Sequence, residues 1–322
     1  MDWNGPPEGG NLSVGVWHDV VEENIKGASA ELPGNDSGDK PDDVITVWQS
    51  TDLSRKPEIV SFSQDNIVAA TGALISAIPL RQRLSSADLV LPADGFAHSY
   101  VLCQTLAALF MHASIAINSV AVPGVDLELA RRGVAPTVII ASAETLANLH
   151  QKETAGISSG LQKFGKYTQD QTISAGRMPT DGILFSLLAP SSANTQPGKL
   201  RLILTSERLG AGSPALSSTM LSDLRIFTRS RIIYALTTAK VAGAVAQTNV
   251  FDYRREDGPQ HSHFGIPLSS VEVKLFNKTN DDQVAAQEPK GELWVGGPAV
   301  VGDELKLGIQ GRVREDCTIA LA

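Results

Sequence analysis

The alternation of short apolar runs with longer amphipathic stretches most limits the folds open to this chain. From Asp43 onward, β-branched or aliphatic runs separate segments in which apolar residues recur at helical spacing. The expected strands are 44–48, 59–62, 88–91, 114–120, 137–141, 200–204 and 231–234, and the expected helices are 66–78, 100–113, 126–133, 143–150 and 213–227. This alternation predicts an α/β fold in which a parallel or mixed sheet is flanked by helices.

The residue composition and the length of the apolar runs change near both ends of the chain. Residues 1–43 include the polar, Gly- and Pro-containing run 34–43, which is typical of a flexible lead-in and linker. After Phe264 the apolar runs become shorter, which favours a small, mostly antiparallel C-terminal sheet. We therefore predict a lead-in over 1–43, an α/β core over 44–262 and a β-rich subdomain over 263–322.

Composition excludes several classes of protein. The formal net charge is −8, and no Lys/Arg run interleaved with aromatics is present, so we expect no nucleic-acid partner. Cys103 and Cys317 form no CxxC pair and have no histidine at ligand spacing, so neither a disulfide framework nor a metal site is predicted. The first ten residues lack the apolar run of a signal peptide. We expect a protein that is not secreted and is intracellular, either cytoplasmic or peripheral to an organelle membrane.

The stretch 99–122 carries no Asp, Glu, Lys or Arg and therefore needs to be tested as a membrane span. It contains Gln104, His112 and Asn118, and polar groups at the centre of a bilayer are costly. We interpret it as a buried helix followed by a buried strand.

Four short motifs carry chemical hypotheses when they are read as residues alone. Residues 210–215 match G-x-G-x-x-A, but residues 206–209 separate the motif from its strand, and a turn leading into a helix is the simpler interpretation. The loop 50–59 has the Ser, Thr, Lys and Arg of an anion site, but it has no glycine and two carboxylates. Residues 234–239 form a hydroxyl-rich strand end, where α/β sheets hold ligands. We expect residues 261–263, with two histidines, to be a polar loop, since no third metal ligand is evident.

Taken in order over 44–321, these segments resemble the adenylate-forming (AMP-binding) superfamily and, within it, the fatty acyl-CoA synthetases. The family has a strand, a phosphate loop rich in Ser, Thr and Gly and containing a lysine, and then a second strand and a helix. Residues 47–66 have the same layout. The resemblance implies the large-domain core of the adenylate-forming fold and nucleotide-binding roles for Ser50, Thr51 and Ser54.

Later segments match further elements of this family. Residues 92–100 resemble the P-x-x-H region that shapes the acyl pocket, with His98 at the position of its histidine. Residues 234–238 resemble the Tyr-Gly-x-Thr-Glu motif, which implies that Tyr234 binds the nucleotide and that Thr237 contacts its α-phosphate. The pieces that resemble the strand beside the adenine and the later structural motifs are 200–210, 265–267 and 291–298.

Several positions depart from the family pattern. The loop glycines are missing, Glu58 stands at the position of the loop lysine, and Thr238 stands at that of the magnesium-binding glutamate. The segment nearest to the ribose-binding aspartate has Ile309 in its place. We find no counterpart of the family's C-terminal lid domain, which carries its catalytic lysine, or of most of the front of its large domain. No catalytic residue is therefore assigned.

The resemblance implies an acid–CoA ligase that uses ATP and magnesium to activate a fatty or other carboxylic acid, with CoA as co-substrate. Each donor that stabilises the developing charge is worth about 3–4 kcal/mol, so the departures predict impaired catalysis by this polypeptide alone. The alternative is a non-catalytic pseudoenzyme that binds an acyl chain, a nucleotide or a protein. An open sheet edge implies a protein partner that covers it. An oxidoreductase with the 210–215 motif is a distant third hypothesis.

Overall fold

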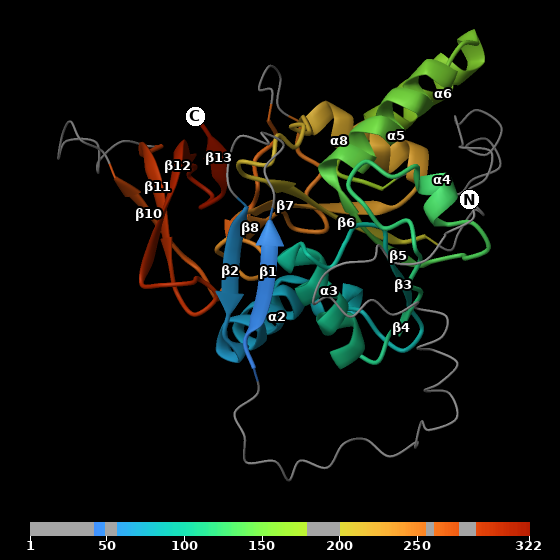
Figure 1. Ribbon diagram of the computed structural model, residues 1–322. Coiled ribbons are helices and arrows are strands. Elements are labelled where there is room, and N and C mark those ends of the chain that lie inside the picture. Colours follow the sequence, from blue (N-terminus) through green and yellow to red (C-terminus); the bar gives the residue numbers. More distant parts are fainter. Residues whose placement is uncertain (1–41, 49–56, 179–199, 256–260, 277–287) are drawn as a thin grey trace, which may run out of the picture. The chain divides into compact units, whose positions relative to one another are not determined.

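The computed structural model describes residues 42–48, 57–178, 200–255, 261–276 and 288–322, which belong to one compact unit (Figure 1). Its central element is a seven-stranded sheet, and the strands lie in the order β4–β3–β5–β6–β7–β8–β9. Their bounds are β4 Ser114–Ile115, β3 Leu89–Pro92, β5 Val138–Ser142, β6 Leu202–Arg208, β7 Arg231–Thr237, β8 Ala246–Gln247 and β9 Ile266–Pro267. The strands from β4 to β7 pair in parallel, and β8 and β9 add antiparallel partners. The predicted α/β fold with a mixed sheet is confirmed.

Helices lie on both faces of this sheet (Figure 1). They are α2 (Gln64–Ala77), α3 (Ser99–Phe110), α4 (Leu127–Ala130), α5 (Ala143–Gly156), α6 (Gly160–Ser174) and α8 (Ser218–Thr228), with a 3₁₀ turn at Leu80–Gln82. Helix α2 packs on α3, and α5 packs on α8. Serine side chains cap four of them at the N-terminus, because Ser63, Ser142, Ser159 and Ser217 each accept a hydrogen bond from a backbone N–H of the first turn.

The hydrophobic core follows from burial of the parallel strands on both faces. All five residues of β5 are buried, and so are the first six of β6. Strands covered by helices on both sides are continuously apolar rather than alternating, as 138–141 and 202–204 are in the sequence. This arrangement holds the carboxyl ends of β3, β5, β6 and β7 at one edge of the sheet.

A separate antiparallel hairpin is formed by β1 (Val44–Trp48) and β2 (Glu58–Phe62). One side of the hairpin is buried, with Val60 and Phe62 in the main core. The other side is open, because Ile45, Val47 and Ile59 are 66%, 56% and 68% exposed. The hairpin therefore presents a small β-branched apolar face to solvent.

The C-terminal part forms the predicted antiparallel sheet. It consists of β10 (Glu272–Phe276), β11 (Lys290–Gly296), β12 (Glu304–Val313) and β13 (Ile319–Leu321) in that order. Backbone hydrogen bonds join it to the rest of the unit, between Phe264 and Ile319 and between Ala242 and Ala299. The two sheets therefore share one hydrogen-bonded backbone network.

One predicted strand is much shorter in the structure than the sequence indicates. The expected strand 114–120 pairs with β3 only at Ser114–Ile115. Beyond it, the Asn118 side chain donates to the carbonyl of Ala130 at 2.9 Å and accepts from the N–H of Val120 at 3.2 Å. These bonds take the place of ladder bonds and turn the chain away.

Across the described residues, we find no helix with the length and apolar character that crossing a bilayer requires.

Candidate functional site

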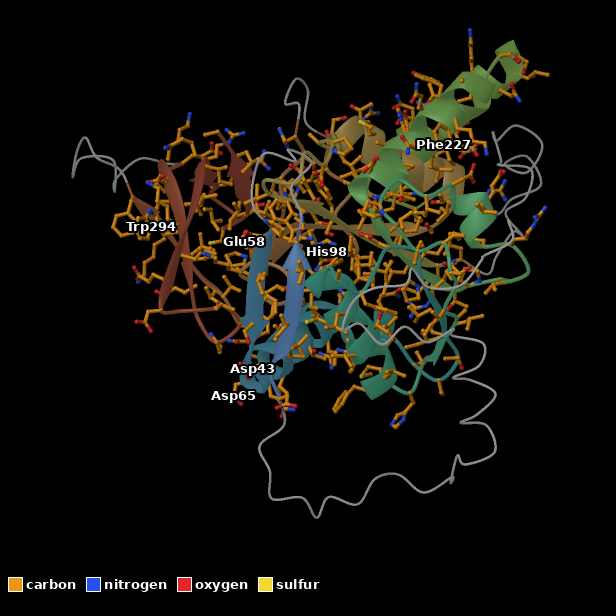
Figure 2. The ribbon with its side chains drawn as sticks, in the orientation of Figure 1. Asp43, Glu58, Asp65, His98, Phe227 and Trp294 are labelled. Atoms are coloured by element: carbon orange, nitrogen blue, oxygen red, sulfur yellow. The ribbon has the colours of Figure 1, made fainter. Side chains whose placement is uncertain are left out.

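The candidate site lies where the carboxyl ends of parallel strands meet. Asp94 follows β3, Glu207 and Arg208 end β6, and Thr237 ends β7. Ligands of open α/β sheets bind in the crevice at this edge. His98 lies at the same edge, at the start of α3, and Figure 2 labels it together with Glu58 of β2.

His98 and Thr237, which the sequence assigned to the acyl pocket and to the nucleotide, are in contact. The Nε2 atom of His98 lies 3.2 Å from Oγ1 of Thr237. The Thr237 hydroxyl also donates to the backbone carbonyl of Glu207 at 3.0 Å. Nδ1 of His98 lies 3.4 Å from a carboxylate oxygen of Asp94. Burial lowers the pKa of His98, although Asp94 opposes this effect, so the imidazole is neutral at pH 7.

A second polar group lies behind this contact. The Tyr234 hydroxyl donates to the Glu207 carboxylate and accepts from the backbone N–H of Leu216 at 3.2 Å. Nδ1 of His261 is 3.5 Å from the same carboxylate. Burial raises the pKa of Glu207 and raises that of Tyr234 well above its usual value, with the Glu207 charge adding to the second shift. Tyr234 is fully buried against Phe264, so a nucleotide-binding role for this residue stays a prediction.

The β1–β2 hairpin contributes two residues to the same edge, the last residue of β1 (Trp48) and the first residue of β2 (Glu58). The guanidinium carbon of Arg208 lies 4.8 Å from the centroid of a Trp48 ring. Glu58 lies opposite Trp48 in the hairpin and forms an ion pair with Lys240, with 3.5 Å between the Glu58 Oε1 and Lys240 Nζ atoms. Lys240 follows β7 by three positions. Thus an acid stands where the family resemblance expects a cation, and a lysine from the neighbouring strand end faces it.

The remaining predicted positions are distributed as follows. Ser50, Thr51 and Ser54 lie outside the described residues. Thr238 is half-buried directly after β7, and Ile309 lies within β12 of the second sheet. The 209–212 segment is a turn that leads to α8, as interpreted from the sequence, with Gly210 at φ 75°.

Residues 261–263 form the predicted loop, but one of its two histidines is packed inside the protein. His263 is buried, with Nε2 3.3 Å from the Asp252 carboxylate and Nδ1 accepting from the N–H of Gly265 at 3.1 Å. Hydrogen-bond partners at both ring nitrogens compensate its burial. Sequence reasoning also missed Asp94, Glu207 and Arg208 as parts of the site. The Glu–Arg pair at 207–208 was the available signal, because charges at the end of an apolar strand are unusual.

Magnesium, which the fold family implies, fits these residues poorly. Thr238 offers no carboxylate, Glu207 accepts from Tyr234 and is shifted towards its neutral form, and Glu58 pairs with Lys240. Over the described ranges, no group of three His, Cys, Asp or Glu side chains could hold a metal ion. Magnesium is held mainly by carboxylates, water and phosphates, so we derive no step through it.

Comparison with known proteins finds a match in structure alone. No protein-family model matches the chain, and no curated protein matches it in sequence. Among solved structures, the N-terminal domain of FACL13 from Mycobacterium tuberculosis superposes with a TM-score of 0.60 at 12% identity. O-succinylbenzoate coenzyme A synthetase (MenE) from Bacillus subtilis, in complex with ATP and magnesium, gives 0.56 at 16% identity, and VinN gives 0.61 at 14%. The chain has the adenylate-forming fold.

The match covers most of this chain but only part of the other proteins. It includes 94% of this chain and 66% of the FACL13 domain, 86% and 49% for MenE, and 95% and 66% for VinN. The adenylate-forming fold therefore accounts for the mixed central sheet and the small antiparallel sheet. A shared fold does not by itself show that this chain has the activity of the longer proteins.

Proposed function

We propose that the protein is an acyl-CoA synthetase-like AMP-binding protein that binds an adenine nucleotide and a carboxylic acid at the carboxyl edge of its sheet. The observation that carries this proposal is the 3.2 Å contact between His98 and Thr237. The family resemblance assigned these residues to the acyl pocket and to the α-phosphate, and the fold brings them together from positions 139 residues apart. A carboxylate and an α-phosphate must meet in an adenylation reaction.

We further propose that ATP-dependent activation of the acid by this polypeptide alone is impaired. Adenylation places new negative charge on phosphate oxygens, and cations or N–H donors must stabilise it. Glu58 and Thr238 remove a cation and a metal ligand at two family positions. Each lost donor costs about 3–4 kcal/mol of transition-state stabilisation, or a factor of several hundred in rate. ATP and magnesium would be the cofactors of any residual activity, and CoA the co-substrate.

Structures of similar proteins support the choice of ligand. The MenE structures contain ATP with magnesium ion, AMP, or the acyl-adenylate intermediate OSB-AMP. The proposed partners are accordingly a small carboxylic acid or acyl chain and a nucleotide.

Pyrophosphate release tests the proposal of impaired catalysis. The protein is incubated with ATP, magnesium and saturated fatty acids of increasing length, and we expect release near the background rate. The double variant Glu58→Lys, Thr238→Glu restores the two family charges and should raise the rate if the remaining site is intact. Robust release by the wild-type protein would contradict impairment. An inactive double variant that still binds ATP would favour the second candidate function.

The second candidate is a non-catalytic module that binds an acyl chain, a nucleotide or a protein. The Glu58–Lys240 pair favours it, because each charge neutralises the other beside the proposed phosphate loop. The exposed β-branched face of Ile45, Val47 and Ile59 on the β1–β2 hairpin is the proposed contact with a protein partner. Replacing Val47 and Ile59 by Thr should abolish such an interaction without changing nucleotide affinity, which a pull-down and calorimetry would show.

A further inference from the structure

Arg208 lies at the carboxyl edge of the sheet, beside the His98–Thr237 contact. It is the last residue of β6, and its guanidinium carbon stacks 4.8 Å from the centroid of a Trp48 ring. Its Nε atom is buried, and among the described residues it has no hydrogen-bond partner. Arginine carries five N–H donors in a rigid fork, so this group has donors to offer at the site.

The charges around Arg208 do not satisfy it. The carboxylates of Asp94 and Glu58 act on it through space, yet Asp94 contacts His98 and Glu58 pairs with Lys240. Burial lowers the pKa of Arg208 to about 10, so the guanidinium stays charged at neutral pH. Taking a charged group out of water without a hydrogen-bonded counter-ion is costly, and a perturbed charge of this kind at a sheet edge is a candidate ligand-binding group.

We propose that Arg208 is an oxyanion-binding residue of this site and that Trp48 is the platform that holds its guanidinium in place. The inference rests on the proposed function for its location and adds a residue to it. Arg208 pairs in the sheet with Thr237, whose hydroxyl contacts His98. An oxyanion bound by Arg208 therefore lies beside the His98–Thr237 contact. A guanidinium recognises phosphate and carboxylate by the same paired N–H bonds, so the ligand's oxyanion is either a nucleotide phosphate or the carboxylate of the acid.

Calorimetric titrations distinguish the two sources. Pyrophosphate reports on any oxyanion site, AMP is compared with adenosine, and decanoate is compared with decanol. The variants are Arg208→Gln and Arg208→Lys, and the control is Arg231→Gln. Arg231 has the same type of side chain stacked on an aromatic ring, 5.4 Å from the Phe251 centroid, but it begins β7 at the opposite edge of the sheet.

We expect Arg208→Gln to weaken binding of the oxyanion ligand about tenfold to a hundredfold, the fold-change that matches the loss of charged hydrogen bonds. Arg208→Lys keeps the charge and should recover only part of the affinity. Arg231→Gln should bind as the wild type does. A loss confined to AMP identifies the phosphate, and a loss confined to decanoate identifies the carboxylate. If Arg208→Gln does not fold, the same comparison is made with Arg208→Lys and Trp48→Leu.

Equal oxyanion affinity in wild type and Arg208 variants would overturn the inference, as would a folded wild-type protein that binds none of pyrophosphate, AMP or decanoate. The proposed function fails separately. Adenosine and AMP binding that is indifferent to Arg208 would leave the function standing and overturn the inference. Pyrophosphate binding that depends on Arg208, without binding of any nucleotide or acid, would support the inference about Arg208 and overturn the proposed function.

Discussion

The Nε2 atom of His98 lies 3.2 Å from the Thr237 hydroxyl, and both groups are buried between the start of α3 and the end of β7. Thr237→Val removes the hydroxyl and leaves a buried imidazole nitrogen of His98 and the Glu207 carbonyl without this partner. An unsatisfied buried group costs about 1–3 kcal/mol, so we expect the free energy of unfolding to fall by that amount. Thr237→Ser, which keeps the hydroxyl, should lose less. Urea unfolding measures both, and equal stability of wild type and Thr237→Val would contradict the contact.

The lowered pKa of His98 predicts a pH dependence of stability. Burial, only partly opposed by Asp94, keeps the folded pKa below the ordinary value of 6.5. As the pH falls below 6.5, the unfolded chain takes up a proton that the folded chain does not, and stability declines. His98→Asn should therefore flatten the decline in melting temperature between neutral pH and the folded pKa. A slope identical to that of the wild type would show that His98 is not shifted.

The raised pKa of Glu207 predicts the opposite slope. Burial raises it above the ordinary value of 4.5, although the Tyr234 hydroxyl and His261 oppose the shift. Between the unfolded and the folded pKa, the folded chain holds the extra proton, so this group's contribution to stability is lost as the pH rises. Glu207→Gln still accepts from Tyr234 but cannot ionise, and should be more stable than the wild type at pH 7. Denaturant midpoints at pH 5 and pH 7 measure the change, and a variant less stable at both would refute it.

Gly265 lies where backbone hydrogen bonds to Ile319 connect the central sheet with the C-terminal sheet, so substituting it tests this connection. Its φ is 74°, and an added Cβ would lie 2.0 Å from the carbonyl oxygen of Gln247. Gly265→Ala should destabilise the protein by about 4 kcal/mol or more, because rigid backbone must move. Gly176→Ala is the matched control, with the same φ of 74° and nothing within 4 Å of the added atom. It should cost only about 1 kcal/mol of backbone strain. Similar melting temperatures for the two variants would contradict the geometry.

The parts of the fold that could be predicted from the sequence are those set by local pattern. Continuous apolar runs such as 138–141 indicated strands buried on both faces, and the order of such runs indicated a parallel sheet with helices. The shorter runs after Phe264 correctly indicated a second, antiparallel sheet. Element ends were less predictable. The strand expected over 114–120 stops at Ile115, because the bonds made by Asn118 depend on Ala130 in another element.

The site was predictable only through residues whose type matches a motif. His98 and Thr237 were identified in this way, and the structure brings them together. Glu207 and Arg208 were read only as part of the segment 206–209 that separates the 210–215 motif from its strand, since nothing in the local sequence shows that the Tyr234 hydroxyl and the Trp48 ring face them. The partners of a buried charge come from distant elements, and a single sequence does not contain that information.

Calorimetric titration of the purified protein and of Thr237→Val with ATP, with and without magnesium, tests for a nucleotide site at this edge of the sheet. We predict micromolar binding by the wild type and affinity weakened about tenfold or more in the variant, which loses a hydrogen-bonding group at the proposed α-phosphate contact. Circular dichroism confirms that both proteins are folded. Absence of ATP binding by a folded wild type, or binding that Thr237→Val leaves unchanged, would contradict a nucleotide site at this edge of the sheet.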